Sequence, residues 1–497
     1  MNHVYRSFYT KSESLVGYMI KRLDLQPGLR VLEPCAGDGA FVGPVLEIEP
    51  TSQLDAYDIN PTAIGALRDK YGAMENVRIL RSDVLTDAGL MLHSNAGGFY
   101  HRIIGNPPYG GWQEYDHRKV LKGIYEGLYV KETYALFLFR CLHLLEDGGV
   151  LSFIVPDTFL SLHMHTALRQ VLLEQAKLDE IAIFPSRFFP GVSFGYSKLC
   201  IITLRRCDNR RACLDNRFKV LTGFSSPEEL LDGGTAIKAH VLRQGEILEN
   251  VGHALLLHEN PRIADLINDC EYHLGDVADC VTGLYTGNDK TFLRASSGSS
   301  GERRGYEIVP DDCIWRGPGI PALTGLAADR HFVPIVKGGA AQYWKPDAWY
   351  VDWSIEAVRQ FHENKKARFQ NPQFYFRDGI ALPMVSSKRV TAWLMEGKVF
   401  DQSVVGVFPK QEHSHLLFYL LAFLNSDACT ALLRTINPSA NNSANYVKKL
   451  PLIIPSKKVL ATIEEKVRVI LAASRTGKAM VTEIEHLNNC ICDLYGV

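Results

Sequence analysis

Residues 105–109 of the chain read Gly-Asn-Pro-Pro-Tyr, and their types and order point to a specific chemistry. Two isoleucines precede them, so they are expected at the end of a buried strand. Each proline fixes its own φ and holds its predecessor in extended geometry, which presets the Asn106 side chain and the Pro107 carbonyl. Two hydrogen-bond acceptors held side by side, with the ring of Tyr109 beside them, suit a flat substrate that carries an exocyclic amino group.

An isolated Pro-Pro pair more often marks an ordinary turn, so this interpretation depends on the residues upstream. Residues 29–42 predict a short apolar strand, a turn of small residues and the start of a helix, with glycines that let the backbone approach a ligand. About 20 residues further on, a second strand at 54–60 ends in Asp58, the spacing expected for a ribose-hydroxyl acceptor. A third strand at 77–80 is followed by Asp83.

These three strand ends, followed by the Asn-Pro-Pro-Tyr motif, resemble the γ class of S-adenosylmethionine-dependent N6-adenine DNA methyltransferases. In that class the cofactor motifs come first, Asn-Pro-Pro-Tyr follows, and a target-recognition domain comes last. The resemblance covers residues 8–205. It implies an α/β fold in which a Rossmann-like class I methyltransferase domain, with a mostly parallel seven-stranded sheet, precedes a mixed α+β target-recognition domain.

The resemblance implies S-adenosylmethionine as the cofactor. It assigns the ribose hydroxyls to Asp58, the adenine amino group to Asp83 and the methionine part to Glu33 and the turn 36–39. The stretch Tyr-Thr-Lys-Ser at 9–12 is similar to the motif, usually Thr-Pro-Pro, that closes over the methionine carboxylate. The cofactor-binding residues expected on this basis are Thr10, Glu33, Ala36, Gly37, Gly39, Asp58, Asp83 and Asn106.

For catalysis, the Asn106 side-chain oxygen and the Pro107 carbonyl are expected to hold both N–H groups of the target amine. A base inside a duplex must be flipped out to reach such a site and must then be gripped by flat side chains. Tyr109 supplies one ring, and the segment 186–191 matches the family segment that supplies the other. Phe189 aligns best there, and Phe188 is the alternative. The expected catalytic residues are therefore Asn106, Pro107, Pro108, Tyr109 and Phe189, with no metal required.

Composition indicates a soluble cytoplasmic protein of at least two domains. The chain has 497 residues, 54 basic and 55 acidic side chains, and a formal net charge of −1. A DNA contact must therefore use local clusters, for which the candidates are Arg303-Arg304, Lys365-Lys366 with Arg368, Lys388-Arg389 and Lys448-Lys449. The sequence shows no signal-peptide pattern or apolar run of membrane-spanning length, and its 11 cysteines include no Cys-x-x-Cys pair.

Changes in composition and in hydrophobic periodicity along the chain predict four segments. Residues 1–205 form the catalytic domain, 206–255 a connector, 256–455 the target-recognition domain and 456–497 a helical segment. Aromatic residues crowd together between 343 and 353. The Ser- and Gly-rich run 295–301 is expected to be a mobile loop. Stretches at 281–288, 337–339 and 437–442 resemble, more loosely, the recognition domains of Type II and phage-exclusion adenine methyltransferases.

The sequence therefore predicts a site-specific N6-adenine methyltransferase that acts on double-stranded DNA as the modification component of a restriction or phage-defence system. A cognate restriction enzyme or defence-complex subunits are its candidate protein partners. One alternative is a protein glutamine methyltransferase, which shares Asn-Pro-Pro-Tyr but is shorter and carries an N-terminal helical domain. The other is a non-catalytic DNA-binding subunit with a methyltransferase fold, which a cofactor-binding titration would distinguish.

Overall fold

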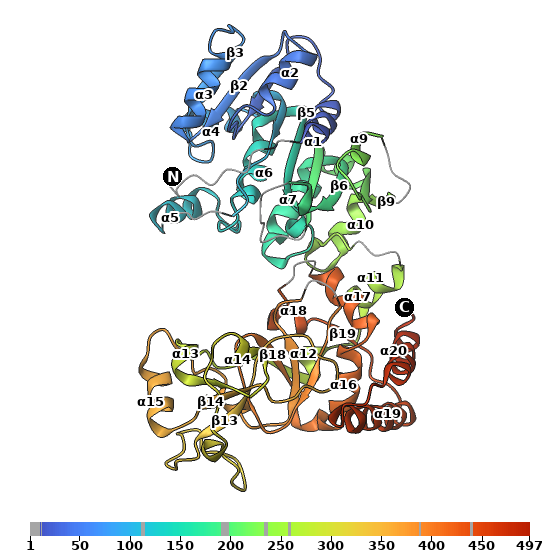
Figure 1. The fold of residues 1–497 in the computed structure, drawn as a ribbon. Helices are drawn as coiled ribbons and strands as arrows, with labels where there is room; N and C mark the ends of the chain where they lie inside the picture. The colour runs from blue at the N-terminus through green and yellow to red at the C-terminus, as the bar shows by residue number, and fades with distance from the viewer. Residues whose placement is uncertain are drawn as a thin grey trace. The chain divides into compact units, whose positions relative to one another are not determined.

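The computed structural model describes residues 10, 12–110, 115–189, 198–232, 237–256, 260–386, 389–437 and 441–497. The chain divides into two compact units, Met1–Leu257 (unit 1) and His258–Val497 (unit 2) (Figure 1). Within the described residues, no single helix has the length and apolar character of a membrane span. The consecutive segments Gln411–Leu424 and Asp427–Ile436 reach that composition only together, with a bend of 80° between them.

Unit 1 is built on one nine-stranded sheet with the order β3-β2-β1-β4-β5-β7-β6-β8-β9. The strands are β1 Arg30–Glu33, β2 Gln53–Asp58, β3 Val77–Arg81, β4 Tyr100–Gly105, β5 Leu145–Pro156, β6 Ala176–Pro185, β7 Lys198–Arg206, β8 Arg217–Thr222 and β9 Lys238–Arg243. The first five strands are parallel, and β7 pairs antiparallel with both β5 and β6.

The expected seven strands are thus extended to nine by residues that the sequence had indicated as a connector. β8 pairs in parallel with β6, and β9 pairs antiparallel with β8. In β8 the first four residues alternate between exposed and buried, the pattern of a strand with one covered face. Residues 217–222 and 238–243 therefore cover the edge of β6, and the compact unit runs beyond residue 205.

Helices cover both faces of this sheet. They are α1 Glu13–Arg22, α2 Val42–Ile48, α3 Pro61–Tyr71, α4 Ala88–Asn95, α5 Tyr115–Ile124, α6 Thr133–Leu144, α7 Thr166–Gln175, α8 Arg210–Leu214, α9 Glu229–Asp232 and α10 Gln244–Glu249. The start of α3 shows the local cause: Asn60 caps the helix by accepting the Thr62 N–H, and Pro61 occupies its first turn.

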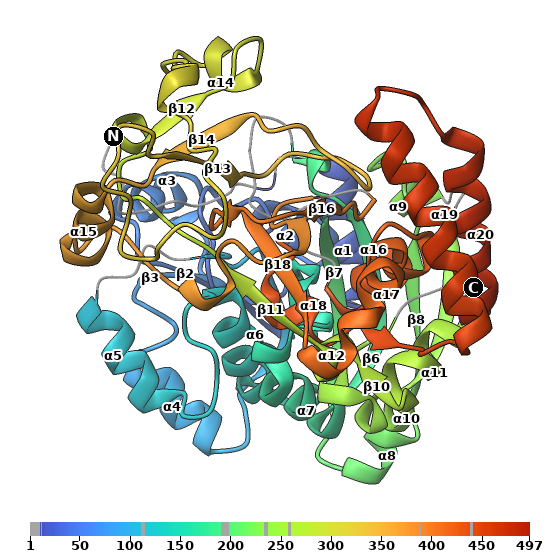
Figure 2. The same ribbon diagram turned by 90° about the horizontal axis from the view of Figure 1, so that it is seen from below.

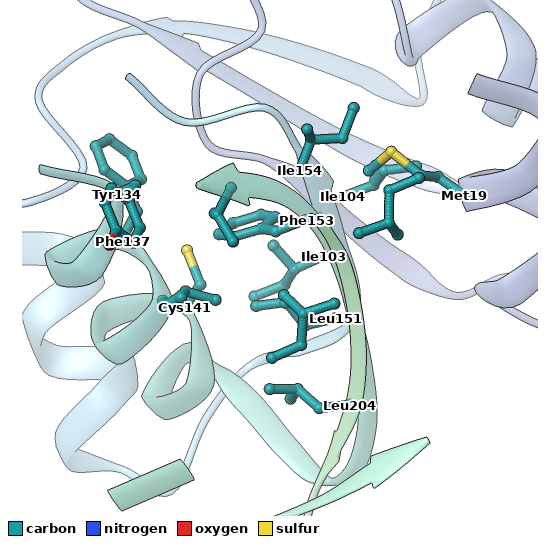
Figure 3. Packing of buried hydrophobic residues seen from close by; sticks show 14 of the residues in the cluster. Met19, Ile103, Ile104, Tyr134, Phe137, Cys141, Leu151, Phe153, Ile154 and Leu204 are labelled. Atoms are coloured by element: carbon teal, nitrogen blue, oxygen red, sulfur yellow. The ribbon is translucent and has the colours of Figure 1, made fainter. Parts of the chain in front are cut away.

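The core of unit 1 lies on both faces of β4 and β5, which are the strands that position the Asn-Pro-Pro-Tyr motif (Figure 3). Successive residues of a strand point to opposite faces, so Ile104 and Ile154 lie with Met19 of α1. On the other face, Phe153 lies toward Cys141 of α6. The two strands are therefore fixed from both sides.

Unit 2 contains two four-stranded sheets and a two-stranded ribbon. The sheets are β11-β18-β15-β16, formed by Ala278–Thr282, Val404–Pro409, Gly379–Pro383 and Trp393–Met395, and β12-β14-β13-β17, formed by Leu293–Ala295, Trp349–Asp352, Phe332–Val336 and Val399–Phe400. The ribbon pairs β10 Tyr272–His273 with β19 Pro451–Leu452.

The helices of unit 2 are α11 Pro261–Asp269, α12 Leu274–Val277, α13 Asp289–Phe292, α14 Ser300–Arg303, α15 Ile355–Glu363, α16 Leu417–Leu424, α17 Asp427–Ile436, α18 Ala444–Val447, α19 Lys457–Arg475 and α20 Val481–Tyr495. α19 and α20 lie side by side and pack against α16 (Figure 2). Ile463, Val467 and Ile470 of the predicted apolar face are buried, whereas Val459 is exposed.

The structure places two segments of unit 2 that the sequence analysis singled out. The run 295–301, expected to be a mobile loop, includes the end of β12 and the start of α14: Ser299 caps α14, and Gly301 fits closely against Trp349, where a Cβ would approach the ring to 2.7 Å. The aromatic crowd between 343 and 353 forms part of the core, with Trp353 fully buried and its N–H donated to the Ala322 carbonyl. These rings stabilise unit 2.

Candidate functional site

The candidate site lies where the parallel strands of unit 1 end. β2 and β3 lie on one side of β1, and β4 and β5 lie on the other, so the strand order reverses between β1 and β4. Ligands of open α/β sheets bind at such a switch point, beyond the carboxyl ends of the strands. Glu33 ends β1, Asp58 ends β2, and Asn106 directly follows β4.

The glycine turn after β1 is tied to the end of β2. Asp58 Oδ2 accepts the Gly37 N–H at 2.8 Å, and its Oδ1 accepts the Asn60 N–H at 2.7 Å. The Ala36 N–H donates to the Tyr57 carbonyl at 2.8 Å. These bonds fix the Asp58 carboxylate, which still has lone pairs for further donors such as sugar hydroxyls.

Gly39 is required by the close packing of α3. Its φ is +85°, and a Cβ there would approach Leu67 Cδ2 to 2.9 Å and the Tyr71 ring to 3.0 Å. A larger residue would therefore push the turn away from the helix. Gly37 also has a positive φ, of 56°, a conformation that favours glycine at that position.

Glu33 is a buried carboxyl group in an anionic environment. It is 1% exposed, and its Oε2 has no hydrogen-bond partner among the described residues. Burial raises the pKa of Glu33 well above its ordinary value, and the neighbouring Asp38 and Asp58 carboxylates raise it further. A cationic ammonium group would satisfy this atom, so the carboxyl end of β1 fits the amino-acid part of S-adenosylmethionine.

Asp83, predicted to accept from the cofactor adenine, lies just beyond β3. Its Oδ1 accepts the Leu85 N–H at 3.0 Å, and its Oδ2 lies 3.2 Å from Nε2 of His117. His117 belongs to α5 and was not among the residues predicted from the sequence. Its position beside Asp83 depends on where α5 packs, which no local motif encodes.

The Asn-Pro-Pro-Tyr tip is held by residues from two other segments. The Asn106 amide nitrogen donates to Thr10 Oγ1 at 3.1 Å, so the structure brings together two residues that lie 96 positions apart. The Pro108 carbonyl accepts from Thr133 Oγ1, at the start of α6, at 2.5 Å. Pro107 is buried, and Tyr109 is 1% exposed. Thr133 was missed because a threonine at a helix start normally indicates only a cap.

Thr133 therefore offers a test of how the tip is held. Replacing it with valine keeps the shape and removes the hydroxyl, so the Pro108 carbonyl loses its donor at a cost of about 1 kcal/mol. We expect turnover to fall several-fold while affinity for S-adenosylmethionine stays unchanged. The measurement is single-turnover methyl transfer beside a cofactor titration. Thr133→Ser should restore the rate, and an equal loss in both variants would exclude this role.

A buried polar network, also missed, joins the start of α6 to the residues after β5. His165 Nε2 lies 2.8 Å from Glu132 Oε2 and 3.2 Å from the Tyr134 hydroxyl, which in turn lies 2.9 Å from Thr158 Oγ1. The network fixes Glu132 and Tyr134 on either side of Thr133. It thereby fixes the donor to the Pro108 carbonyl.

Asp157, which directly follows β5, should make the stability of unit 1 depend on pH. Burial raises its pKa from 3.8 to about 6, although Lys198 partly opposes the shift. The folded state then binds more protons than the unfolded chain between those values. The free energy of unfolding should therefore fall as the pH rises through this window and stay level above it.

We expect Asp157→Asn to remove this dependence. At pH 8 the substitution should stabilise unit 1 by up to about 3 kcal/mol, the free energy that corresponds to moving the pKa from 3.8 to about 6. At pH 3.5 it should have little effect. Denaturant unfolding followed across this pH range measures the difference. A constant difference between the two proteins at all pH values would contradict the assignment.

The two phenylalanines of the predicted aromatic segment are both buried. Phe188 stacks on Phe184 of β6 with ring centroids 5.5 Å apart and planes at 11°, so its ring is part of the core. Phe189 is the first residue after the short helix 186–188 and is also largely buried. The remaining predicted positions, 190 and 191, lie outside the described residues. Both rings lie in the core of unit 1, so the choice of Phe189 over Phe188 stays a prediction.

The sheet order and the residues at its carboxyl edge fit the class I methyltransferase fold. Residues 68–189 match the family described as Eco57I restriction-modification methylase. This part of unit 1 is thus similar to the Eco57I restriction-modification methylase family, and it lies within residues 8–205, which the sequence resemblance to adenine DNA methyltransferases covers.

Relatives with similar sequences carry related names. The chain is 24% identical to the Type II methyltransferase M.HindII of Haemophilus influenzae, over 91% of this chain and 89% of that protein. It is 23% identical to the adenine-specific methyltransferase PglX of Lacticaseibacillus casei, over 76% of this chain. The Type II methyltransferase M.AccI of Acinetobacter calcoaceticus is 28% identical over 31% of this chain. The chain spans 31% of PglX and 28% of M.AccI.

Among solved structures, the cryoEM structure of the DrdV–DNA complex is similar to both units. It aligns over 94% of this chain and 57% of the DrdV chain, with a TM-score of 0.54 and 13% sequence identity. At that identity the likeness concerns the fold alone.

Proposed function

We propose that this protein transfers the methyl group of S-adenosylmethionine to N6 of an adenine flipped out of double-stranded DNA at a specific sequence. We further propose that it is the modification component of a restriction-modification or phage-defence system. The observation that carries the proposal is the placement of Asn106 and Pro107 at the switch point beside Glu33 and Asp58. The names of the relatives support it, and they give no support to the alternatives of a protein glutamine methyltransferase or a non-catalytic subunit.

Cofactor binding uses the ends of β1, β2 and β3. Glu33 would hold the ammonium group, Asp58 the ribose hydroxyls and Asp83 the adenine amino group. When bound, S-adenosylmethionine supplies a methyl group on a positively charged sulfur, which is a good leaving group. The turn 36–39 presents backbone close to the ligand because Gly37 and Gly39 adopt positive φ.

The chemical task of the protein is to orient the target amine. Its lone pair is delocalised into the adenine ring, so the nitrogen is a weak nucleophile. Asn106 Oδ1 and the Pro107 carbonyl would accept its two N–H bonds and favour a pyramidal nitrogen with its lone pair directed at the methyl group. Holding reactants in such a near-attack geometry contributes most of the rate in a reaction of this kind.

The experiment that tests the proposal is adenine-modification sequencing in cells. The full-length protein is expressed in a host without adenine methyltransferases, and an Asn106→Ala variant serves as the inactive control. We expect N6-methyladenine at one recurring sequence with the wild-type protein and none with the variant. Unmodified DNA together with tritium transfer to a protein would favour the glutamine methyltransferase alternative.

The rings proposed to grip the base give a graded prediction. Stacking contributes roughly 1–3 kcal/mol per base, so Tyr109→Ala and Phe189→Ala should lower methyl transfer markedly. Tyr109→Phe should be much milder because it keeps the ring. Phe188→Ala should affect stability rather than base binding, because that ring stacks on Phe184. Since Tyr109 is buried, the side chains that cover it must move aside when a base enters.

Fluorescence of 2-aminopurine at the target position reports flipping in each of these variants. A Phe188→Ala protein that loses the flipping signal, beside a Phe189→Ala protein that keeps it, would reverse the assignment of the two rings.

A further inference from the structure

Unit 2 contains a cavity of about 590 Å³ that no step above uses. Five chain segments converge on it: the residues after β11, after β13, after α15, at the end of β15 and before β18. Its volume lies within the range of about 300–1,000 Å³ that is typical of ligand sites. We refer to it as the unit 2 pocket.

The floor of the unit 2 pocket is a fixed ionic group. Lys337 Nζ lies 2.8 Å from Asp289 Oδ2 and 3.1 Å from Asp401 Oδ2. Burial by itself lowers the pKa of Lys337, but the Asp401 and Asp289 carboxylates outweigh it and raise that pKa, so the ammonium stays charged. Thr286 Oγ1 donates to Asp289 at 2.6 Å, and the Ser403 N–H donates to Asp401 at 2.7 Å.

This floor selects the kind of group that can enter. The floor alone carries one ammonium and two carboxylates, a net charge of about −1, which disfavours a phosphate at the floor. A neutral group that donates hydrogen bonds is favoured instead. Carboxylate oxygens are acceptors, and nucleobases present amino groups that could donate to them.

The walls add neutral side chains in fixed positions. The Gln370 amide nitrogen donates to the Gly283 carbonyl at 2.8 Å and to Thr282 Oγ1 at 3.2 Å, which orients the amide. Tyr285 also lines the pocket, and two backbone hydrogen bonds of 3.1 and 2.8 Å join it to Arg368 of the rim. Gln402 also lines the pocket and is half-buried.

The rim is cationic and partly apolar. Arg368 lines the pocket and is exposed, and Lys365 and Lys366 are exposed in the same loop after α15. No ion pair among the described residues engages the side chains of these three cations. The apolar part is Val385, which follows β15, lines the pocket and is 73% exposed. The charge pattern is thus negative at the floor and positive outside.

We propose that the unit 2 pocket holds a base edge of the DNA target, with Gln370 and Gln402 as the reading side chains. Arg368, Lys365 and Lys366 contact the flanking phosphates. This inference rests on the proposed function and extends it to the residues that set sequence preference. The negatively charged floor favours the hydrogen-bond donors of a base edge, and the positively charged rim favours the phosphates on either side of it.

The first test concerns the rim and does not depend on methyl transfer. Binding of a fluorescein-labelled duplex of mixed sequence is followed by anisotropy at several salt concentrations. Losing one phosphate contact lowers the slope of log affinity against log salt by about 1, so we expect this change in Arg368→Ala. Arg330→Ala, which removes an exposed arginine of the same unit outside the pocket, should keep the wild-type slope.

The second test concerns the reading side chains. Adenine-modification sequencing of cells that express Gln402→Ala should show roughly tenfold weaker discrimination at one position of the methylated sequence. Gln360→Ala, on the exposed face of α15, should leave the sequence unchanged. Thermal unfolding checks that every variant is folded.

The outcomes separate this inference from the proposed function. Unchanged salt slope in Arg368→Ala together with unchanged discrimination in Gln402→Ala would overturn the pocket assignment while methylation by the wild-type protein stands. A wild-type protein that methylates no DNA would overturn the proposed function. A reduced salt slope in Arg368→Ala alone would then still support the pocket as a DNA contact.

Discussion

Replacing Asn106 by alanine is expected to remove nearly all methyl transfer while S-adenosylmethionine and DNA still bind. The variant loses one of the two acceptors that orient the target amine, and removing one preorganised group of this kind costs about 10²- to 10³-fold in rate. Binding should survive because Glu33, Asp58 and the backbone of the turn 36–39 are also proposed to contact the cofactor, so that Asn106 is only one of its expected contacts. The measurement is tritiated methyl transfer to an adenine-containing duplex under single-turnover conditions.

Two comparisons make this result specific. Asn95→Ala removes an exposed asparagine at the end of α4 and should leave the rate unchanged. Thr10→Val removes the hydroxyl that accepts from the Asn106 amide at 3.1 Å and should reduce the rate less than Asn106→Ala does. Methyl transfer by Asn106→Ala at the wild-type rate would mean that the motif is only a turn, and the proposed mechanism would fail.

The contrast between Asn106 and Thr133 shows how far the sequence could predict this site. Glu33 and Asp58 end strands, Asn106 directly follows one, and Asp83 lies two residues beyond β3; parallel strands bring such positions to one edge of a sheet. Strand order and spacing therefore predict that these four residues lie at the same edge of the sheet. Thr133 reaches the same tip from the start of a helix, at a position set by packing of α6 on the sheet, and no residue pattern near 133 encodes that contact.

The domain boundary illustrates a different limit. The charged stretch at 205–211 resembles a linker, yet its arginines form ion pairs with Asp179, Asp208, Glu174 and Asp215 within unit 1. β8 and β9 then continue the sheet. The alternating pattern in β8 indicated a strand in the sequence. Whether that strand joins the sheet depends on the open edge of β6, which is a property of the assembled fold.

Asp58→Ala should weaken S-adenosylmethionine binding by about 1–3 kcal/mol, which corresponds to roughly 5- to 150-fold in affinity. The carboxylate is the proposed acceptor for the ribose hydroxyls, and it also accepts the Gly37 and Asn60 N–H groups. The substitution therefore removes a ligand contact and two bonds that shape the glycine turn. Calorimetry of the folded variant measures the affinity, and thermal unfolding measures the structural part.

Asp55→Asn separates these two contributions because Asp55 is another buried carboxylate of β2. It pairs with Arg78 and accepts the Tyr100 hydroxyl at 2.7 Å, and it lies three residues before the carboxyl edge. Its loss should lower the thermal midpoint and leave cofactor affinity in the folded protein unchanged. If Asp58→Ala behaves in the same way, Asp58 only anchors the turn, and the ribose contact must come from another group. If affinity falls in Asp58→Ala alone, the end of β2 binds the cofactor directly.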